Sequence, residues 1–255
     1  MLVTMPTSLP REAYGPRGAV RAGAVWRVLQ GLALYGSEAV GWPPERYRSL
    51  GSAFVVREMT VVYERTPGFA QPLRGDTWIA GFRHGLLCRR ELDLYDALGA
   101  CLSASQDWAH LGQGRPARAP VELMEAFAPL PGRDGVRLPA TGPELGEPTS
   151  WETVAWHSWM DPLGHANHPL FIDWCDEALA TSLVAAGGDA QALRPVAEWV
   201  RFRRPVFANE RVVVRSQRVA CDAGLAHRHE LEADGHVVGE AITVRALLDD
   251  ASVAR

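Results

Sequence analysis

An internal duplication is the feature that most limits the folds open to this chain of 255 residues. Residues of the first half recur in the second half in the same order and at nearly one offset. The clearest pairs are Tyr63 and Phe202, Arg65 and Arg204, and Glu91 and Glu230 (202 − 63, 204 − 65 and 230 − 91 all equal 139). Such a repeat predicts two similar structural units joined in tandem.

Both halves show the same order of expected elements. Apolar residues at helical spacing predict a helix over residues 24–40 and another over 169–183. Segments rich in Val, Trp, Phe and Tyr follow each helix and predict three or four strands separated by turns. The Pro- and Gly-dense segment between the halves predicts a linker that contains a short helix at 121–127. We therefore predict an α+β fold with an internal pseudo-dimer, divided into an N-terminal repeat (1–111), a linker (112–150) and a C-terminal repeat (151–255).

Composition excludes several classes of protein. Hydrophobic residues make up 47% and charged residues 22% of the chain, which is typical of a soluble globular protein. No apolar run approaches the length of a membrane span, and the N-terminus lacks the pattern of a secretory signal, so we expect a cytoplasmic protein. A formal net charge of -4 offers no general attraction to nucleic acid. The four cysteines are widely spaced, which predicts reduced thiols rather than disulfides or a metal site.

The segment from Asp161 to Glu177 carries the main candidate site. A strand predicted over residues 153–159 leads into an acidic residue and a Pro-x-Gly turn, and the second long helix follows. The N–H groups at a helix start can polarise a carbonyl oxygen, a carboxylate before them can act as base or nucleophile, and an imidazole can move a proton. A structural interpretation stays open at this point: Asp161 as a turn cap, Asn167 as an N-cap residue, and His165 and His168 as ordinary polar residues.

The same segment resembles the signature of hotdog thioesterases, Asp-x-x-Gly-His-x-Asn-Asn-x-x-Tyr-x-x-Trp-x-x-Glu. His168 replaces the second Asn and Phe171 replaces the Tyr, while the other positions match as Asp161, Gly164, His165, Asn167, Trp174 and Glu177. The first half resembles the N-terminal repeat of acyl-ACP thioesterases through residues 29–30, 57–62, 74–78 and 103–108. The resemblance covers residues 11 to 248 and extends to 4-hydroxybenzoyl-CoA thioesterase-like proteins.

This resemblance implies two tandem hotdog units, each a long central helix wrapped by an antiparallel sheet. It implies hydrolysis of an acyl thioester of phosphopantetheine, carried by acyl carrier protein or CoA, in fatty acid biosynthesis. Asp161 would activate water or attack the thioester carbon, His165 would support it, and amides from Asn167 onward would bind the oxyanion. Neither a cofactor nor a metal is expected. The residues implied in substrate binding are Gly164, His168, Phe171 and Arg204.

The first repeat has no acidic residue in the matching loop, residues 14–18, so we expect one active site per chain and an acyl pocket shaped by the first repeat. Plant-type acyl-ACP thioesterases carry Asn where this chain has Leu163, and Glu where it has Pro205. These departures favour the simpler acyl-CoA type of hotdog enzyme. Two alternatives therefore stay open: a non-catalytic protein that binds acyl thioesters or a carrier protein, and a hotdog dehydratase acting on 3-hydroxyacyl thioesters, whose His-bearing motif is not found here.

Other candidate residues have two interpretations each. The pair His227-x-His229 could bind a metal, but a surface strand is the favoured interpretation. Several arginines of the second half could contact phosphates or form a solvated strand face, and Arg204 shares a structural role with Arg65 through the repeat. Glu177 could form a helix ion pair or support the site. The internal pairing is compatible with a monomer or a homodimer.

Overall fold

The structure is a computed structural model that describes residues 1–248. The chain divides into two compact units. Unit 1 comprises Met1–Pro10 and Arg27–Arg137, and unit 2 comprises Arg11–Trp26 and the chain from Leu138 onward. The division falls after Trp26, inside the helix α1 (Ala22–Glu38), so that the segment before this helix belongs to unit 2.

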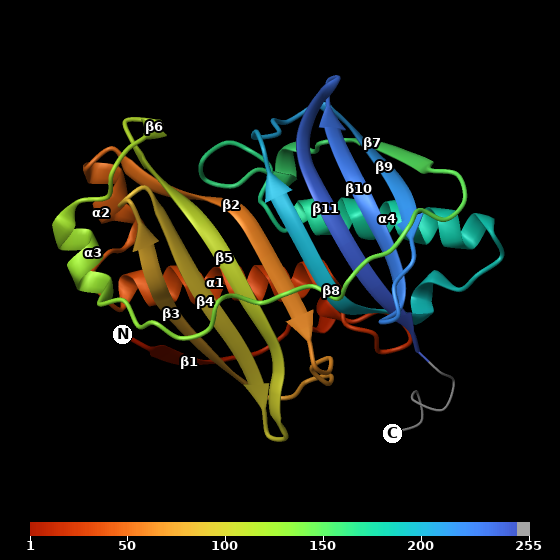
Figure 1. Cartoon of the computed structure of the whole chain (residues 1–255), viewed down its shortest axis with the longest axis horizontal. Coiled ribbons are helices and arrows are strands. Elements are labelled where there is room, and N and C mark those ends of the chain that lie inside the picture. The colour runs from red at the N-terminus through yellow and green to blue at the C-terminus, as the bar shows by residue number, and fades with distance from the viewer. Residues whose placement is uncertain (249–255) are drawn as a thin grey trace. The chain divides into compact units, whose positions relative to one another are not determined.

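Unit 1 is an antiparallel sheet with α1 running across its strands (Figure 1). The strand order is β1-β3-β4-β5-β2, and the short strand β6 pairs with β5. Leu32 of α1 lies against the backbone of Gly75, where a Cβ atom would be 2.8 Å from its Cδ2 atom. The strands are β1 (Val3–Thr7), β2 (Ser52–Tyr63), β3 (Leu73–Arg83), β4 (Leu87–Asp96), β5 (Gly99–Gly112) and β6 (Arg115–Pro116), and the shorter helices are α2 (Pro44–Ser49) and α3 (Val121–Phe127).

Unit 2 repeats this design, with the helix α4 (Leu170–Ala185) running across its sheet (Figure 1). Its strand order is β7-β9-β10-β11-β8. The strands are β7 (Thr149–Val154), β8 (Leu193–Phe202), β9 (Arg211–Val219), β10 (Leu225–Ala233) and β11 (His236–Leu247). The order in unit 1 is the same when β1 to β5 are matched to β7, β8, β9, β10 and β11, which confirms the predicted tandem α+β repeat.

The repeat is not uniform along the chain. The tip of the first hairpin pairs Asp96 with Gly99, and the tip of the second pairs Ala233 with His236. These tips lie 137 positions apart (233 − 96 and 236 − 99), whereas the sequence comparison placed this region 139 apart. A shift of two residues keeps every side chain on the same face of a strand, so the difference leaves the pattern of burial intact.

The predicted helices agree with the structure, and one predicted strand does not. The helix at 121–127 is present, and α1 ends where Gly41 adopts a φ of 80°, with the Trp42 amide donating to the Ser37 carbonyl. Such a left-handed residue after a helix favours glycine. The strand predicted over 153–159 is wrong, because β7 ends at Val154 and residues 157–159 form a 3-10 helix. The indoles of Trp156 and Trp159 stack there with centroids 4.8 Å apart, since residues three apart face the same way in a 3-10 turn.

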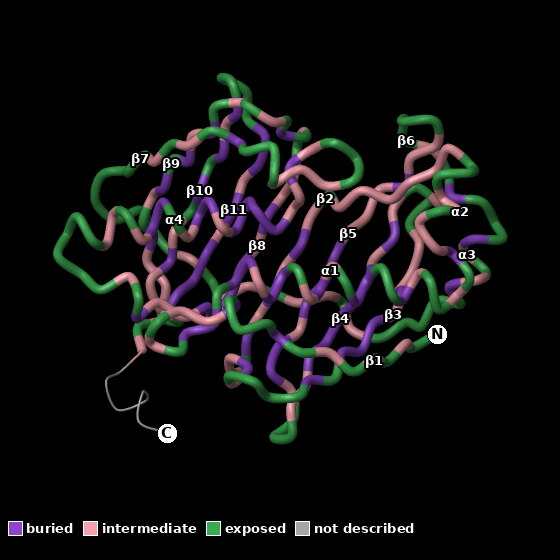
Figure 2. The backbone as a smooth tube through the Cα atoms, turned by 180° about the vertical axis from the view of Figure 1, so that it is seen from behind, coloured by how far each residue is buried: buried purple, intermediate pink, exposed green. Residues whose placement is uncertain are grey.

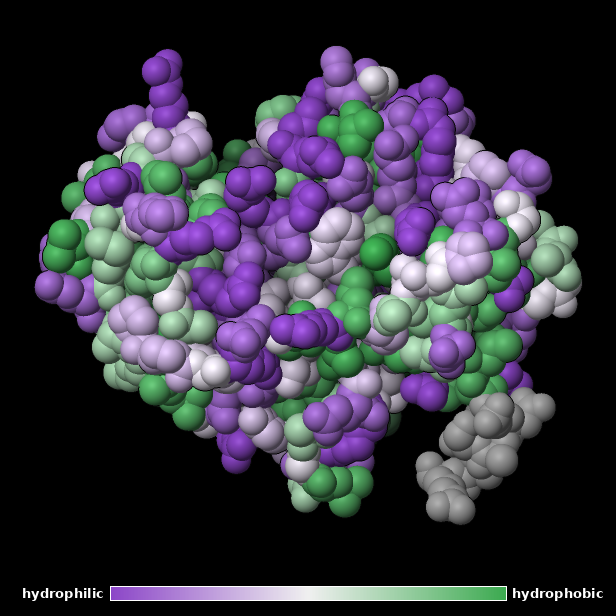
Figure 3. Space-filling model, in the orientation of Figure 1, coloured by the Kyte–Doolittle hydropathy of each residue, from purple (hydrophilic) through white to green (hydrophobic). Residues whose placement is uncertain are grey.

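Buried residues concentrate along the strands and helices, and exposed residues in the connections (Figure 2). On the face seen in Figure 3, hydrophilic and hydrophobic residues are interspersed. All four cysteines are free thiols, and three of them are buried. Within residues 1–248, none of the helices combines the length and the apolar character that crossing a membrane requires.

Candidate active site

The loop from Asp161 to Asn167 connects the 3-10 helix (His157–Trp159) to α4 and closes on itself. The Asp161 amide donates to the His165 carbonyl at 2.8 Å, and the Gly164 amide donates to the Asp161 carbonyl at 2.9 Å. Gly164 has a φ of 82°, in the left-handed region that glycine adopts without strain. The Pro-x-Gly sequence therefore folds into a tight turn that brings the two ends of the loop together.

This turn places the side chains of Asp161 and His165 beside each other. The Asp161 Oδ2 atom lies 3.4 Å from His165 Nδ1, and the side chains are 14% and 27% exposed. The Asp161 Oδ1 atom accepts a hydrogen bond of 2.8 Å from the Leu163 amide. One carboxylate oxygen thus caps the turn and the other faces the imidazole, so the turn-cap interpretation and the pairing of the two residues both hold. The cap fixes the direction of the carboxylate.

Two backbone contacts anchor the loop within unit 2. The Asn167 amide donates to the Trp159 carbonyl at 3.1 Å, and the Ala166 amide donates to the Val206 carbonyl at 2.7 Å. The second contact ties the loop to the connection between β8 and β9, which contains Arg204. The Arg204 guanidinium donates to Glu210 at 2.8 Å, and the other Glu210 oxygen accepts from the Phe207 amide at 2.9 Å.

Arg204 therefore braces its own connection. Arg65, in the connection between β2 and β3, instead reaches the tip of the β4–β5 hairpin, where its guanidinium pairs with both oxygens of Asp96 and bonds to the Gly99 carbonyl at 2.7 Å. These contacts agree with the structural role that the repeat indicated for both arginines. A contact between Arg204 and substrate stays a prediction.

The amides at the start of α4 are largely occupied by protein carbonyls. The Asn167 amide bonds to Trp159, as stated above, and the Leu170 and Phe171 amides donate to the carbonyls of Asn167 and His168 at 2.9 and 3.2 Å. Pro169 has no N–H group. To bind an oxyanion as expected, these amides would have to give up their present carbonyl partners. The positive end of the helix dipole can stabilise an oxyanion without any such change.

Aromatic side chains form a continuous wall beside the loop. It contains the two residues that replace signature residues, His168 and Phe171, and two that the sequence did not indicate as part of a site, Trp26 and Phe202. The ring pairs are Trp156–Trp159, Trp159–Trp174, Trp174–Phe171, Phe171–Phe202, Phe202–His168 and His168–Trp26, with centroids between 4.8 and 6.3 Å apart. Phe171 is buried, so it packs beneath the other rings and contacts Trp174 and Phe202.

A buried ionic network lies behind the wall. The Trp26 indole N–H donates to Glu198 at 2.6 Å, Glu198 lies 3.0 Å from the guanidinium of Arg245, and Arg245 also lies 2.7 Å from Asp176 of α4. Arg245 is 2% exposed and Glu198 is fully buried. Burial raises the pKa of Asp176, and the charge of Arg245 opposes that rise. Within unit 2, the network joins Trp26, at the start of α1, to α4, β8 and β11, and no motif in the sequence indicated it.

Glu177, the last residue of the signature, plays no part in this network. It is exposed, and its carboxylate has no partner among residues 1–248. Neither the helix ion pair nor the supporting contact that the sequence left open is present there. The preceding residue, Asp176, is the acid that ties α4 to the sheet.

His229 is buried and His227 half-buried, so the favoured interpretation of this pair as part of a surface strand was wrong. The His229 ring is 3% exposed, and its two nitrogens lie 2.8 Å from the hydroxyls of Ser216 and Thr243. Burial lowers the pKa of His227 to about 4 and that of His229 to about 3. Among residues 1–248, no group of three or more His, Cys, Asp or Glu side chains is placed to hold a metal ion.

Buried neutral histidine makes the stability of unit 2 dependent on pH. Between the ordinary pKa of 6.5 and the folded value of about 3, His229 binds a proton in the unfolded chain but not in the folded chain. The contribution of His229 to the free energy of unfolding is therefore complete above pH 6.5. It falls by roughly 1.4 kcal/mol for each pH unit below that value. Chemical unfolding at pH 4.5 to 7 should show a shallower fall for His229→Gln than for the wild type. The exposed His236→Gln serves as the control, and equal slopes in all three proteins would contradict the prediction.

Comparison with known proteins gives matches in structure alone. No protein-family model and no curated protein matches the chain. A solved structure described as an oleoyl thioesterase from Lactobacillus plantarum matches with a TM-score of 0.84 and 16% identity, covering 98% of each chain. An acyl-ACP thioesterase from Bacteroides thetaiotaomicron matches at 0.79 and 14% identity, and a 12:0-ACP thioesterase from Umbellularia californica at 0.75 and 16%, each covering 96% of this chain and 97% of the other. The chain has the double hotdog fold of these thioesterases.

The duplication inside the double hotdog chain extends to the candidate loop. Tyr14–Val20 repeats the bridge of Met160–Ala166, and the Gly15 amide donates to the Ala19 carbonyl at 2.8 Å, as Asp161 does to His165. Gly18, with a φ of 76°, corresponds to Gly164. Gly15 and Ala19 stand at the positions of Asp161 and His165 (161 − 15 and 165 − 19 both equal 146). The first loop keeps the backbone of the second without its carboxylate and imidazole.

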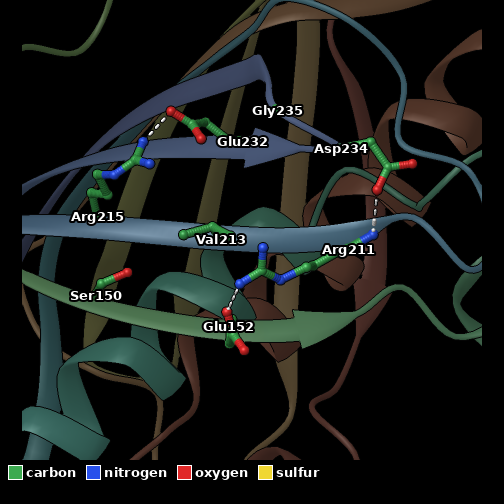
Figure 4. Close-up of a pocket in the computed structure, with 8 residues that line it drawn as sticks. All are labelled: Ser150, Glu152, Arg211, Val213, Arg215, Glu232, Asp234 and Gly235. Atoms are coloured by element: carbon green, nitrogen blue, oxygen red, sulfur yellow. Dashed lines mark hydrogen bonds and ion pairs between the residues drawn. The ribbon is translucent and has the colours of Figure 1, made fainter.

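A hollow on the outer face of the second hotdog repeat contains none of the predicted site residues. Side chains of β7, β9 and the β10–β11 hairpin line it (Figure 4). Its two arginines are paired, Arg211 with Glu152 and Arg215 with Glu232. Exposed pairs of this kind stabilise little and leave no free charge for a phosphate. The solvated strand face is therefore the better interpretation of these arginines.

Proposed function

We propose that this double hotdog protein hydrolyses acyl thioesters at Asp161 and His165. The observation that carries the proposal is the oriented contact between the Asp161 carboxylate and the His165 imidazole, 3.4 Å apart at the start of α4. The three solved structures of the same fold, whose names describe thioesterases, support the reaction class. The reaction converts a thioester and water into a carboxylic acid and a thiol.

The uncapped oxygen of Asp161 is the group that would act on the thioester. As a general base, it takes a proton from water while the water oxygen attacks the carbonyl carbon, and the C–S bond then breaks with return of a proton to the sulfur. As a nucleophile, it attacks the carbonyl carbon and forms an anhydride as the C–S bond breaks and the thiol leaves with a proton, and water then hydrolyses the anhydride to the carboxylic acid and the free Asp161 carboxylate. In both routes His165 hydrogen-bonds to the carboxylate or carries the proton, and the dipole of α4 stabilises the oxyanion.

We infer that the thiol carrier is a phosphopantetheine, as part of CoA or of an acyl carrier protein. The turn of Pro162, Leu163 and Gly164 is exposed and carries no large polar side chain. Its backbone is therefore accessible to the pantetheine chain of a bound thioester. The aromatic wall would bound the reacting end of the acyl group, with His168 in contact and Phe171 as its support. Arg204 would reach a phosphate of the carrier only by leaving Glu210.

A thiol-release assay over acyl-CoA and acyl-carrier-protein substrates of increasing chain length tests the proposal. We expect turnover, and we expect His165→Ala to lower kcat/KM about tenfold or more. A positioned acid–base group contributes about 100- to 10,000-fold, and His165 acts in support of Asp161. The exposed His157→Ala, in the preceding 3-10 turn, should match the wild type. Tight acyl-thioester binding without release of thiol would instead indicate a binding protein, and formation of an enoyl product would indicate a dehydratase.

A further inference from the structure

Unit 1 contains a buried arginine whose charge is not neutralised by any carboxylate of the described residues. Arg90 of β4 is 5% exposed and faces α1. Its guanidinium donates to two neutral hydroxyls, Thr77 at 3.2 Å and Ser37 at 3.1 Å, and lies 5.4 Å from the ring centre of Phe127. Among residues 1–248, no carboxylate lies within ion-pair distance of it.

A glycine in α1, Gly36, leaves space for this guanidinium. A Cβ atom on Gly36 of α1 would lie 2.6 Å from Arg90 Nη1 and 2.7 Å from the methyl carbon of Thr77. Neither distance is tolerable for real atoms, so the guanidinium rests against bare helix backbone. An alanine at this position would push the guanidinium away.

The ionisable side chains nearest Arg90 do not supply a counter-charge. Burial raises the pKa of Tyr47 and that of Cys88 to about 12 each, so both are neutral at physiological pH. Burial also lowers the pKa of Arg90, yet a guanidinium does not lose its proton in proteins. The guanidinium of Arg90 therefore keeps its positive charge without a counter-charge from these neighbours.

Unit 2 shows how the same fold treats a buried arginine that serves structure alone. Arg245 is buried as deeply as Arg90 but has two carboxylates, Asp176 at 2.7 Å and Glu198 at 3.0 Å. A buried charge without a partner is strongly destabilising. Because Arg245 is neutralised by two carboxylates, the lack of any carboxylate at Arg90 requires an explanation other than structural support. The comparison indicates that the counter-charge of Arg90 is not among residues 1–248 and is supplied by a bound ligand.

Further donors lie in the same core. Tyr47 Oη and Trp42 Nε1 are both buried, the indole N–H has no hydrogen-bond partner, and the two rings are 5.4 Å apart. The Tyr47 hydroxyl interacts with the hydroxyl of Ser37, which also accepts from the Arg90 guanidinium at 3.1 Å. A phenol and an indole N–H can each donate to an anion, so the group is rich in donors and poor in acceptors.

We propose that unit 1 contains a buried binding site for a small monovalent anion, a halide or a single carboxylate group, centred on Arg90 with Tyr47 and Trp42 as additional donors. One negative charge balances the guanidinium, whereas a dianion would leave an excess charge in an apolar core. The site is independent of the proposed hydrolysis at Asp161.

Thermal unfolding of the full chain in different sodium salts at one ionic strength tests this site. Chloride, formate and acetate are titrated against the bulky sulfonate MES. A ligand of the folded state should raise Tm by about 3 °C or more for each tenfold increase above its Kd. A rise with chloride alone identifies a halide, a rise with formate or acetate identifies a carboxylate, and a rise no larger than in MES would overturn the proposal.

Three variants assign the effect to Arg90. Arg90→Met should abolish the anion dependence and melt no lower than the wild type in MES, because the unbalanced charge is gone. Tyr47→Phe keeps the core filled and should weaken anion binding several-fold, and Gly36→Ala should weaken it by displacing the guanidinium. The exposed Arg57→Met removes a charge of the same unit and should behave as the wild type. Anion dependence that persists in Arg90→Met would refute the assignment.

Discussion

Asp161→Asn is expected to lower kcat/KM for thioester hydrolysis at least 100-fold while leaving Tm within a degree or two of the wild type, since general-base groups contribute about 100- to 10,000-fold. Asparagine keeps the size of the side chain and an oxygen that can accept the Leu163 amide, which bonds to Asp161 at 2.8 Å. It lacks the second basic oxygen that faces His165 at 3.4 Å. The loop should therefore stay folded and lose only its base or nucleophile. Thiol release and thermal unfolding, measured on the same preparation, check both parts.

Glu177→Gln provides the matched control for Asp161→Asn. It removes another carboxylate of the same signature, but Glu177 is exposed on α4 and lies outside the buried network of Asp176 and Arg245. We expect its activity and Tm to equal those of the wild type. Full hydrolysis by Asp161→Asn would remove Asp161 from the mechanism, and equal losses in both variants would show that the assay reports a general effect of charge.

The features that the sequence predicted depend on local patterns. The tandem repeat was visible because matched residues such as Arg65 and Arg204 stand at equivalent positions, just after β2 and β8, and each forms an ion pair there, Arg65 with Asp96 and Arg204 with Glu210. The proximity of Asp161 and His165 was predictable because a Pro-x-Gly turn closes over five residues and brings its ends together. Both predictions needed only short-range geometry.

The features that the sequence missed depend on contacts between distant segments. Glu198 meets Trp26 across 172 positions, and Arg245 meets Asp176 across 69. Nothing in the local sequence of Glu198 distinguishes it from an exposed strand residue. The His227-x-His229 spacing puts both rings on one face of a strand, but period-two alternation does not say which face meets the helix. Only the register of β9, β10 and β11 decides that.

The second large expected effect is on stability. Arg245→Met should lower the free energy of unfolding by about 3–5 kcal/mol, because it removes one partner of a buried ionic network and leaves the other charges uncompensated. The two carboxylates affected are Asp176, at 2.7 Å, and the fully buried Glu198, at 3.0 Å. Chemical unfolding near pH 7 measures the loss. We expect part of it to be regained at lower pH, because protonation of Asp176, whose pKa burial already raises, removes one of the unpaired charges.

A variant with all three charges replaced separates lost packing from unpaired charge. Arg245→Met combined with Asp176→Leu and Glu198→Met should regain most of the stability that Arg245→Met loses, since apolar replacements of a complete buried network are often neutral or stabilising. The regain should be incomplete, because Glu198 also accepts the Trp26 indole N–H at 2.6 Å and that donor would lose its partner. If the triple variant were instead less stable than Arg245→Met, the network would be a source of net stability, and the aromatic wall of His168 and Trp26 would depend on its charges rather than on its volume.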